Sequence, residues 1–316
     1  MKNNGEIKVN QAEIDKKKLE RKTSNAISNL YIDLSTDLSV KADEYMGFNT
    51  NISPQAKQVA LNQIRQDIKQ RFKEIESKQS DIITKSAKES GENTMLYINQ
   101  LMFRAGLNMS GSYPQLVDKS VNNVITGKAY KKDWNLYRAL RKNTNQVVLD
   151  ADRIIQWGLD ENKSIYDIIT DLSAYVNPTE KSNFKVTKKR KIAAYAQRIA
   201  RTVIQHVYQF VTRGACKNNP YIQAFRWTSA GAPTTCEVCA ERDGMLFPIG
   251  LEPLDHPNGL CWLELVTMPL DEFQEKVQRW SEGQYNEVEF YIRDAFGYNN
   301  KNARNVASSH RMMQHF

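Results

Sequence analysis

The chain has 316 residues, of which 41% are apolar and 25% are charged. These values are typical of globular proteins, and the length allows two or more domains. The low content of Gly (14) and Pro (9) excludes a collagen-like or low-complexity chain and favours helices. The net charge of +8 is uneven, because residues 216–316 hold 9 Lys/Arg and 13 Asp/Glu. The basic excess in residues 1–215 predicts an acidic partner; the alternative is a solubilising surface.

The N-terminal sequence lacks the apolar core of a secretory signal, and no apolar run approaches the roughly 18 residues of a membrane span. We therefore expect a soluble protein that is made in a reducing cytoplasm. In that compartment a disulfide framework is not expected from the four cysteines.

Residues 1–28 are polar and predict a charged arm, either a solvated helix or a flexible segment that orders against a partner. Residues 29–130 predict a helical region. One helix is expected to end near Gly47, and the next to begin with Ser53 as N-cap and Pro54 at the first helical position. Further helices are predicted over 80–90, 93–106, 113–126 and 133–158.

Residues 131–215 predict a helical core. Ser164 is expected to cap a helix over 163–176, and apolar residues at three- and four-residue steps predict a long helix over 188–213 with Gly214 as its C-cap. Residues 216–282 predict a small β module, with short strands over 224–228, 245–249 and 262–266 and a helix from Pro269 to Trp280. Residues 283–316 are expected to form a C-terminal tail.

The predicted fold is therefore mainly α, with an elongated helical N-terminal half and a small C-terminal α+β module that resembles a zinc ribbon. The chemistry of that module lies in Cys236, Cys239, His256 and Cys261. Three thiolates and one imidazole form a standard closed ligand set for structural Zn²⁺, and a C-x-x-C turn places two sulfurs on one side of the ion. Two alternatives stay open: a redox-active C-x-x-C pair, or buried cysteines beside a coincidental histidine.

The segment from Lys181 to Thr235 contains no Asp or Glu and eleven basic residues. Helix faces exposed to solvent normally mix both signs of charge, although such a face is the alternative interpretation. The segment predicts contact with DNA phosphates or with an acidic protein surface, without sequence reading. The candidate contact residues are Lys185, Lys188, Lys189, Arg190, Lys191, Arg198 and Arg201.

The sequence contains none of the common phosphate-loop, nucleophile-elbow or metalloprotease motifs. His206 lies within the predicted long helix and is interpreted as a structural histidine rather than a base. Glu287 and Glu289 are similar to the E-x-E pair of ADP-ribosyltransferases, but no matching Arg and Ser-Thr-Ser elements accompany them. We therefore expect a protein that is not an enzyme.

Over roughly residues 120–266 the chain resembles the phage head morphogenesis family, the Mu F-like minor head proteins. The resemblance rests on the order of short motifs, which are Ile199-Ala200-Arg201-Thr202, Phe225-Arg226-Trp227-Thr228, Cys236-Glu237-Val238-Cys239-Ala240, Asp243-Gly244, and His256-Pro257-Asn258 with Cys261. The chain departs from the family pattern H-P-N-C-R-C, because Gly259 and Leu260 replace one cysteine and the arginine.

The resemblance implies a low-copy structural protein of the virion, located inside the capsid near the portal and assembled in the host bacterial cytoplasm without a membrane. Its implied partners are the portal protein, the major capsid or scaffolding protein, and the DNA backbone. Its implied roles are head assembly and DNA packaging or ejection, with the helical residues 29–130 as the docking region. The alternatives are an enzyme, either redox or ADP-ribosyltransferase-like, and a DNA-binding regulator with a zinc ribbon.

Overall fold

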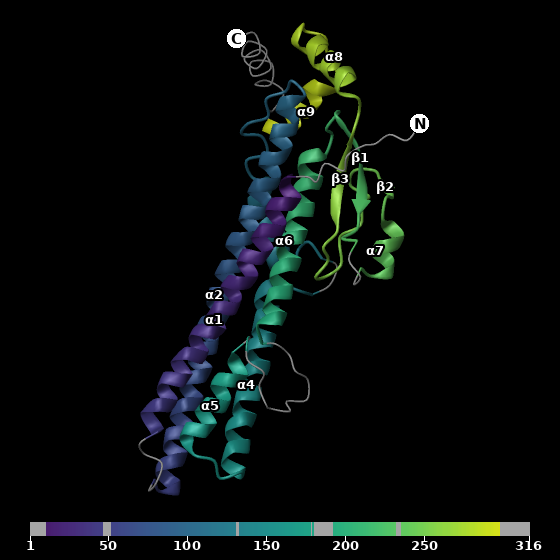
Figure 1. Ribbon diagram of the computed structural model, residues 1–316. Helices are drawn as coiled ribbons and strands as arrows, with labels where there is room; N and C mark the ends of the chain where they lie inside the picture. The colour runs from purple at the N-terminus through teal and green to yellow at the C-terminus, as the bar shows by residue number, and fades with distance from the viewer. Residues whose placement is uncertain are drawn as a thin grey trace. The chain divides into compact units, whose positions relative to one another are not determined.

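The computed structural model describes residues 11–46, 52–130, 133–177, 179, 192–231 and 235–297. It is mainly helical, with a small sheet in the last third of the chain (Figure 1). The elements are α1 (Gln11–Met46), α2 (Pro54–Arg104), α3 (Leu116–Thr126), α4 (Leu136–Asp160), α5 (Ile165–Val176), α6 (Ile192–Cys216), β1 (Ile222–Thr228), α7 (Glu237–Arg242), β2 (Leu246–Phe247), β3 (Trp262–Thr267), α8 (Leu270–Ser281) and α9 (Glu287–Phe296). The predicted fold class is confirmed.

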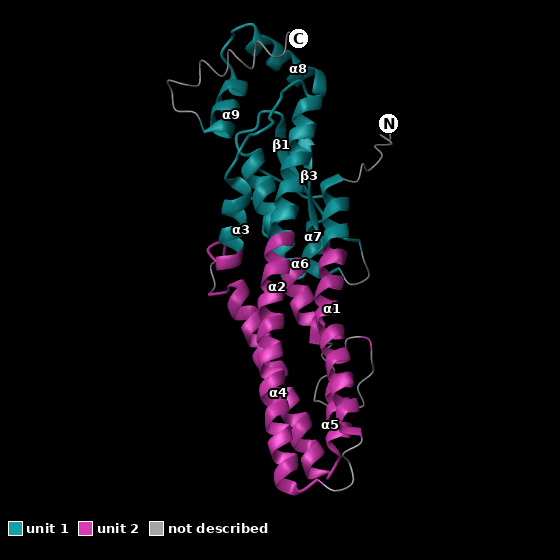
Figure 2. Ribbon diagram, turned by 90° about the vertical axis from the view of Figure 1, so that its left-hand side faces the viewer, with its two compact units in different colours: residues 1–19, 87–124, 202–316 teal, residues 20–86, 125–201 magenta. Residues whose placement is uncertain are grey.

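The chain forms two compact units, drawn in different colours in Figure 2. Unit 1 comprises Met1–Leu19, Ala87–Val124 and Thr202–Phe316, and unit 2 comprises Glu20–Ser86 and Ile125–Arg201. The sequence suggested five consecutive segments, whereas each unit combines stretches far apart in the sequence. None of the helices in the described part of the chain has both the length and the apolar character needed to cross a bilayer.

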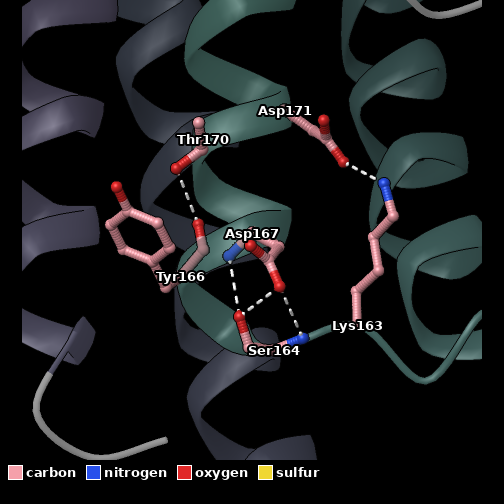
Figure 3. Close-up of polar contacts among 6 residues, drawn as sticks. All are labelled: Lys163, Ser164, Tyr166, Asp167, Thr170 and Asp171. Atoms are coloured by element: carbon pink, nitrogen blue, oxygen red, sulfur yellow. Dashed lines mark hydrogen bonds and ion pairs between the residues drawn. The ribbon is translucent and has the colours of Figure 1, made fainter.

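Unit 2 contains α4 and α5, whose boundaries follow local sequence signals. Asn135 accepts a hydrogen bond from the Arg138 amide at the start of α4. At the start of α5 the Ser164 hydroxyl accepts the Asp167 amide at 3.0 Å, while the Asp167 carboxylate accepts the Ser164 amide at 3.3 Å (Figure 3). This reciprocal pair satisfies two amides that no helical carbonyl reaches, which confirms Ser164 as the cap.

Two glycines lie within helices of unit 1, where the sequence suggested helix ends. The helix predicted to begin at Pro54 and those predicted over 80–90 and 93–106 are one helix, α2, and Gly91 lies in its interior. A Cβ at Gly91 would lie 2.8 Å from Val117 of α3, and one at Gly214 would lie 2.5 Å from Leu116. Gly214 is therefore not a C-cap, because α6 continues to Cys216. Both glycines allow close packing of helices, which their sequence neighbours do not reveal.

The expected boundary between a charged arm and the first helix is also different in the structure. α1 begins at Gln11 and continues without interruption through residue 28. Ala12, Lys16 and Leu19 are buried at helical spacing, although two of the three are small or charged. The helical alternative for this segment agrees with the structure from residue 11 on, but the helix is not solvated at Lys16, because the Lys16 ammonium is buried and donates to Gln205.

The sheet of unit 1 is antiparallel in the order β2-β1-β3 and agrees with the three predicted strands. Phe225 of β1 lies opposite Phe247 of β2 and Leu265 of β3. The side chains of Phe225 and Trp227 are fully buried, and the Tyr208 hydroxyl of α6 donates to the Leu263 carbonyl at 3.2 Å. One face of the sheet thus packs on α6, which forms the core of unit 1.

After the sheet, α8 presents Phe273, Val277 and Trp280 as predicted. The expected tail over 283–316 is different in its first part, because α9 is a packed helix. The Trp280 indole donates to the Glu289 carboxylate at 2.7 Å, and the buried Tyr291 lies in the same helix. Apolar residues at helical spacing in α9 stabilise its contact with α8. Residues 298–316 of the predicted tail lie outside the residues that the structure describes.

Replacing the cap at Ser164 is expected to destabilise unit 2. Ser164→Ala removes the acceptor for the Asp167 amide and is expected to cost about 1 kcal/mol of unfolding free energy. The measurement is urea unfolding followed by circular dichroism.

The matched control is Thr170→Ala in the same helix, where the hydroxyl only donates to the Tyr166 carbonyl at 2.9 Å (Figure 3). That carbonyl is already part of the helix, so the control is expected to change stability by less than about 0.5 kcal/mol. Equal losses in the two variants would contradict the role assigned to the cap.

Candidate metal centre

The four Cys/His residues lie in the two connections between the strands of unit 1, one from β1 to β2 and the other from β2 to β3. Cys236 is the N-cap of the short helix α7, and Cys239 lies one turn later. His256 and Cys261 belong to the loop that enters β3, whose first residue pairs with Thr228 of β1. The chain between α7 and β2 is held on β1, since the Gly244 amide donates to the Trp227 carbonyl at 2.8 Å. The sheet therefore brings both halves of the predicted ligand set to one end.

The structure brings all four predicted ligands around Cys239. The donor atoms of Cys236, Cys239 and His256 lie within 4.8 Å of one another, and so do those of Cys239, Asp255 and Cys261. Cys239 is common to both groups. Each of the two groups is compact enough to hold a metal ion, and the predicted ligand set Cys236, Cys239, His256 and Cys261 is divided between them.

None of the four cysteines of the chain forms a disulfide. The three thiols of the cluster, those of Cys236, Cys239 and Cys261, have different electrostatic surroundings. The Cys239 amide and thiol, together with His256, lower the pKa of the partly exposed Cys236. Burial raises the pKa of Cys239, and burial also raises that of Cys261, with a further contribution from the Asp255 carboxylate. Two buried thiols beside a carboxylate lose their protons only if a cation offsets the charge, and a bound metal ion is such a cation.

The imidazole of His256 is oriented by its own loop. Nδ1 lies 3.1 Å from the Pro257 carbonyl, and a proton donated there leaves the Nε2 lone pair for a ligand bond. Although burial acts against the charged ring, this carbonyl and the charges of Asp255 and Cys236 raise the pKa of His256. The surroundings of the His256 ring are therefore one carbonyl acceptor, Pro257, and two groups that carry negative charge when ionised, Asp255 and Cys236.

Asp255 organises the loop that carries His256 and Cys261, and no local pattern in the sequence indicates this role. Its buried carboxylate accepts the His256 amide at 2.8 Å and the Cys261 amide at 3.2 Å. The Cys239 thiol lies 3.9 Å from the same carboxylate. Burial raises the pKa of Asp255, whereas the hydrogen bonds from the His256 and Cys261 amides lower it in part. One carboxylate thus fixes the backbone at two ligand positions.

α6 holds Asp255 from the other side through polar residues on a helix face that is otherwise apolar. Gln205 Nε2 donates to the Asp255 carboxylate at 3.2 Å and also to the Cys261 carbonyl. Gln209 Oε1 accepts the Asp255 amide at 2.9 Å, and His206 Nε2 pairs with its carbonyl at 3.0 Å. In the sequence, a signal for these contacts is the spacing of Gln205 and Gln209, which places both amides on one face of the helix.

His206 is buried, as expected for a structural histidine. Burial lowers its pKa to about 4, so the ring is neutral at physiological pH. Thr202, which lies one turn before His206 and ends the motif Ile199-Ala200-Arg201-Thr202, also contacts the loop. Its hydroxyl accepts the Asn258 amide at 2.8 Å. The helix motif and the His256-Pro257-Asn258 turn are thereby in direct contact.

Gly259 lies against Asp255 in the loop between His256 and Cys261. A Cβ built on Gly259 would lie 2.1 to 2.3 Å from the atoms of the Asp255 carboxyl group. The loop therefore excludes every side chain at this position while Asp255 keeps its hydrogen bonds. The Asp255 carboxyl group is thus the steric reason for a glycine here.

The predicted basic residues fall into two groups. Lys185, Lys188, Lys189, Arg190 and Lys191 lie outside the described residues. Arg198 is exposed on α6 and lies over the Tyr195 ring at 5.7 Å, whereas Arg201 lies 3.9 Å from the Glu20 carboxylate within unit 2. Of the described pair, Arg198 is thus the more accessible to an acidic partner.

The E-x-E pair has structural partners. Glu289 is buried and accepts hydrogen bonds from Trp280 and Arg293, and Glu287 pairs with Lys276 of α8. Both carboxylates thus stabilise the contact between α8 and α9.

Comparison of the chain with protein-family models, curated proteins and solved structures finds no match.

The steric role of Gly259 gives a prediction. Gly259→Ala must displace the Asp255 carboxyl group and is expected to cost about 1–3 kcal/mol of unfolding free energy. Urea unfolding of the purified protein measures the loss.

A double-mutant cycle isolates the clash. In an Asp255→Ala background the same Gly259→Ala change is expected to cost less than about 0.5 kcal/mol, because the obstructing group is gone. If the glycine substitution costs the same in both backgrounds, the clash with Asp255 is not its cause.

Proposed function

We propose that the centre holds one structural Zn²⁺ ion through Cys236, Cys239, His256 and Cys261. Tetrahedral Zn–S bonds of about 2.3 Å place sulfurs about 3.8 Å apart. The donor atoms of Cys236, Cys239 and His256 lie within 4.8 Å of one another, and Cys261 lies within the same distance of Cys239, which belongs to both groups. The small sheet has few residues, and a cross-link between α7 and the loop before β3 stabilises it. Asp255 then supports the ligand loop through its amides.

The alternative is a redox-active pair, and one observation favours it. Cys236 is at the N-cap of α7, and its pKa is lowered, as in reactive C-x-x-C motifs. Against it, α7 has only six residues and the neighbouring sheet is antiparallel. A Zn²⁺ site requires His256 and Cys261, whereas a dithiol requires only Cys236 and Cys239.

Loss of a ligand is expected to release the metal. Cys239→Ala is expected to remove about one equivalent of zinc per chain and to increase proteolysis of the segment over 229–262. The measurements are elemental analysis and limited trypsin digestion with and without chelator.

Cys216→Ala is the matched control, because Cys216 is equally buried but lies outside the cluster. It is expected to keep the full metal content. Wild-type protein purified without zinc that also fails to take up added zinc would exclude the metal site.

For the whole protein we propose a structural minor head protein of a tailed phage, present in few copies near the portal. The observation that carries this proposal is the contact of the Thr202 hydroxyl with the Asn258 amide, since it joins two motifs on which the resemblance depends. Cys236 and Cys239 of a third motif lie close to His256 of the second. The partners proposed are the portal protein, the major capsid or scaffolding protein and the DNA backbone, inside the virion.

Neutralising the basic cluster tests this proposal. Changing Lys188, Lys189, Arg190 and Lys191 to Gln is expected to weaken binding to duplex DNA. The slope of log affinity against log salt is expected to fall by roughly 0.9 for each phosphate that the variant no longer neutralises. Filter binding at several salt concentrations measures this slope. Co-purification with the portal protein of the same phage tests the location.

The charge-matched control changes four exposed lysines elsewhere, namely Lys73, Lys78, Lys119 and Lys142. This control is expected to keep most of the affinity, because it removes the same charge without touching the cluster. If both variants lose affinity equally, net charge alone is responsible. Failure of the portal protein to co-purify contradicts the proposed location.

A further inference from the structure

A second group of polar side chains is buried in unit 1, on the side of α6 that faces the N-terminal part of α1. Lys16 is 1% exposed, and its ammonium donates to Gln205 Oε1 and lies 4.7 Å from the centre of the Tyr208 ring. Burying a lysine is costly unless its charge is offset nearby. The function proposed above does not use this lysine.

The other end of the same amide contacts the metal loop. Gln205 Nε2 donates to the Asp255 carboxylate and to the Cys261 carbonyl, while its Oε1 accepts from Lys16. One buried side chain thus connects the cation of α1 to the backbone of a candidate ligand. Since both ends of the amide are engaged, a shift of either partner leaves a buried polar atom without its bond.

The charges of the two sides are complementary, because Lys17 pairs with the buried Glu13 and the charge of Lys16 is left to face α6 and the metal loop. Three thiolates and a neutral imidazole around Zn²⁺ carry a net charge of −1, and the Asp255 carboxylate adds another negative charge. His206, which also contacts Asp255, is neutral. Lys16 supplies a positive charge through one intervening amide, and in a buried environment such a charge stabilises an anionic centre.

The neighbouring residue reinforces the same contact. The ammonium of Lys17 pairs with the buried Glu13 carboxylate at 2.5 Å and lies 5.0 Å from the centre of the Trp262 ring, and Trp262 directly follows Cys261. Lys18, by contrast, is exposed and pairs only weakly with Asp15 at 3.9 Å. Successive lysines of one charged run therefore have different surroundings, and the two that approach β3 and its entry loop are Lys16 and Lys17.

We propose that Lys16 is a positioning residue of the metal centre, so that docking of residues 11–19 and binding of the metal stabilise each other. This inference rests on the proposed zinc site. The coupling is reciprocal: a docked helix raises metal affinity, and a bound metal holds the helix. The segment predicted to be a solvated arm thereby covers the metal loop.

The test compares zinc affinity, measured by competition with a chromophoric chelator, in the full chain and its variants. Lys16→Met keeps the length of the side chain and removes the charge, and it is expected to weaken zinc binding about tenfold, as for other residues that orient ligands. Lys18→Met, the control on the same helix turn, is expected to bind like the wild type. Equal affinities of the Lys16→Met variant and the wild type would overturn the proposal.

A second variant covers the case in which Lys16→Met does not fold. Gln205→Leu removes the bridging amide and is by itself expected to weaken zinc binding about tenfold. Where both single variants fold, the double variant is expected to be no weaker than the weaker of the two, because both act through one connection. Fully additive losses would show two independent effects and would overturn the proposal.

Hydrogen exchange gives a readout independent of affinity. Amides of residues 11–19 are expected to exchange faster after chelation in the wild type, and this difference is expected to disappear in Gln205→Leu. Exchange that does not respond to zinc in the wild type would overturn the coupling. A wild type that binds no zinc would instead remove the metal site itself, and portal co-purification reports on the head-protein function separately.

Discussion

The buried carboxylate of Asp255 is the constraint on which the candidate centre depends. It accepts two backbone amides of its own loop and the Gln205 side chain of α6. Hydrogen bonds to a buried charge contribute roughly 1.5–3 kcal/mol each, so their loss would release the loop. Because the carboxylate fills the space beside residue 259, that position must be glycine. Backbone geometry and ligand positions are thus set by one side chain.

The loop is in turn fixed to α6 at several points besides Asp255. Arg213 pairs with the buried Glu252 and donates to its carbonyl at 3.0 Å, and Thr202 accepts the Asn258 amide. These contacts lie on separate turns of the same helix. The helix is therefore a rigid support along which the loop is aligned, and the short strands need contribute little stability of their own.

A division of roles follows for the proposed head protein. The metal centre offers a closed set of donors, so its proposed effect is on stability and on the placement of α1. A metal ion stabilises a small sheet without a large core, which is the effect proposed for it in this module. The basic segment before α6 would then be the part that contacts DNA or the portal.

The sequence by itself determined the features that depend on neighbours along the chain. Ser164 and Asp167 form their cap within four residues, the strands follow local alternation, and the C-x-x-C spacing sets two sulfurs one helical turn apart. The fold class and the approach of the four Cys/His residues could therefore be predicted. Local periodicity is sufficient for such features because their partners are close in sequence.

Only the tertiary structure decided the rest. Gly91 and Gly214 lie within helices because other helices pack against them, and Lys16 is buried because Gln205 lies opposite it, 189 residues away in the chain. Asp255 has its role because donors from two parts of the chain meet around it. The type of a residue limits the groups that it can bind. Which of these groups lies next to it depends on packing between distant segments of the chain, which a local sequence pattern does not predict.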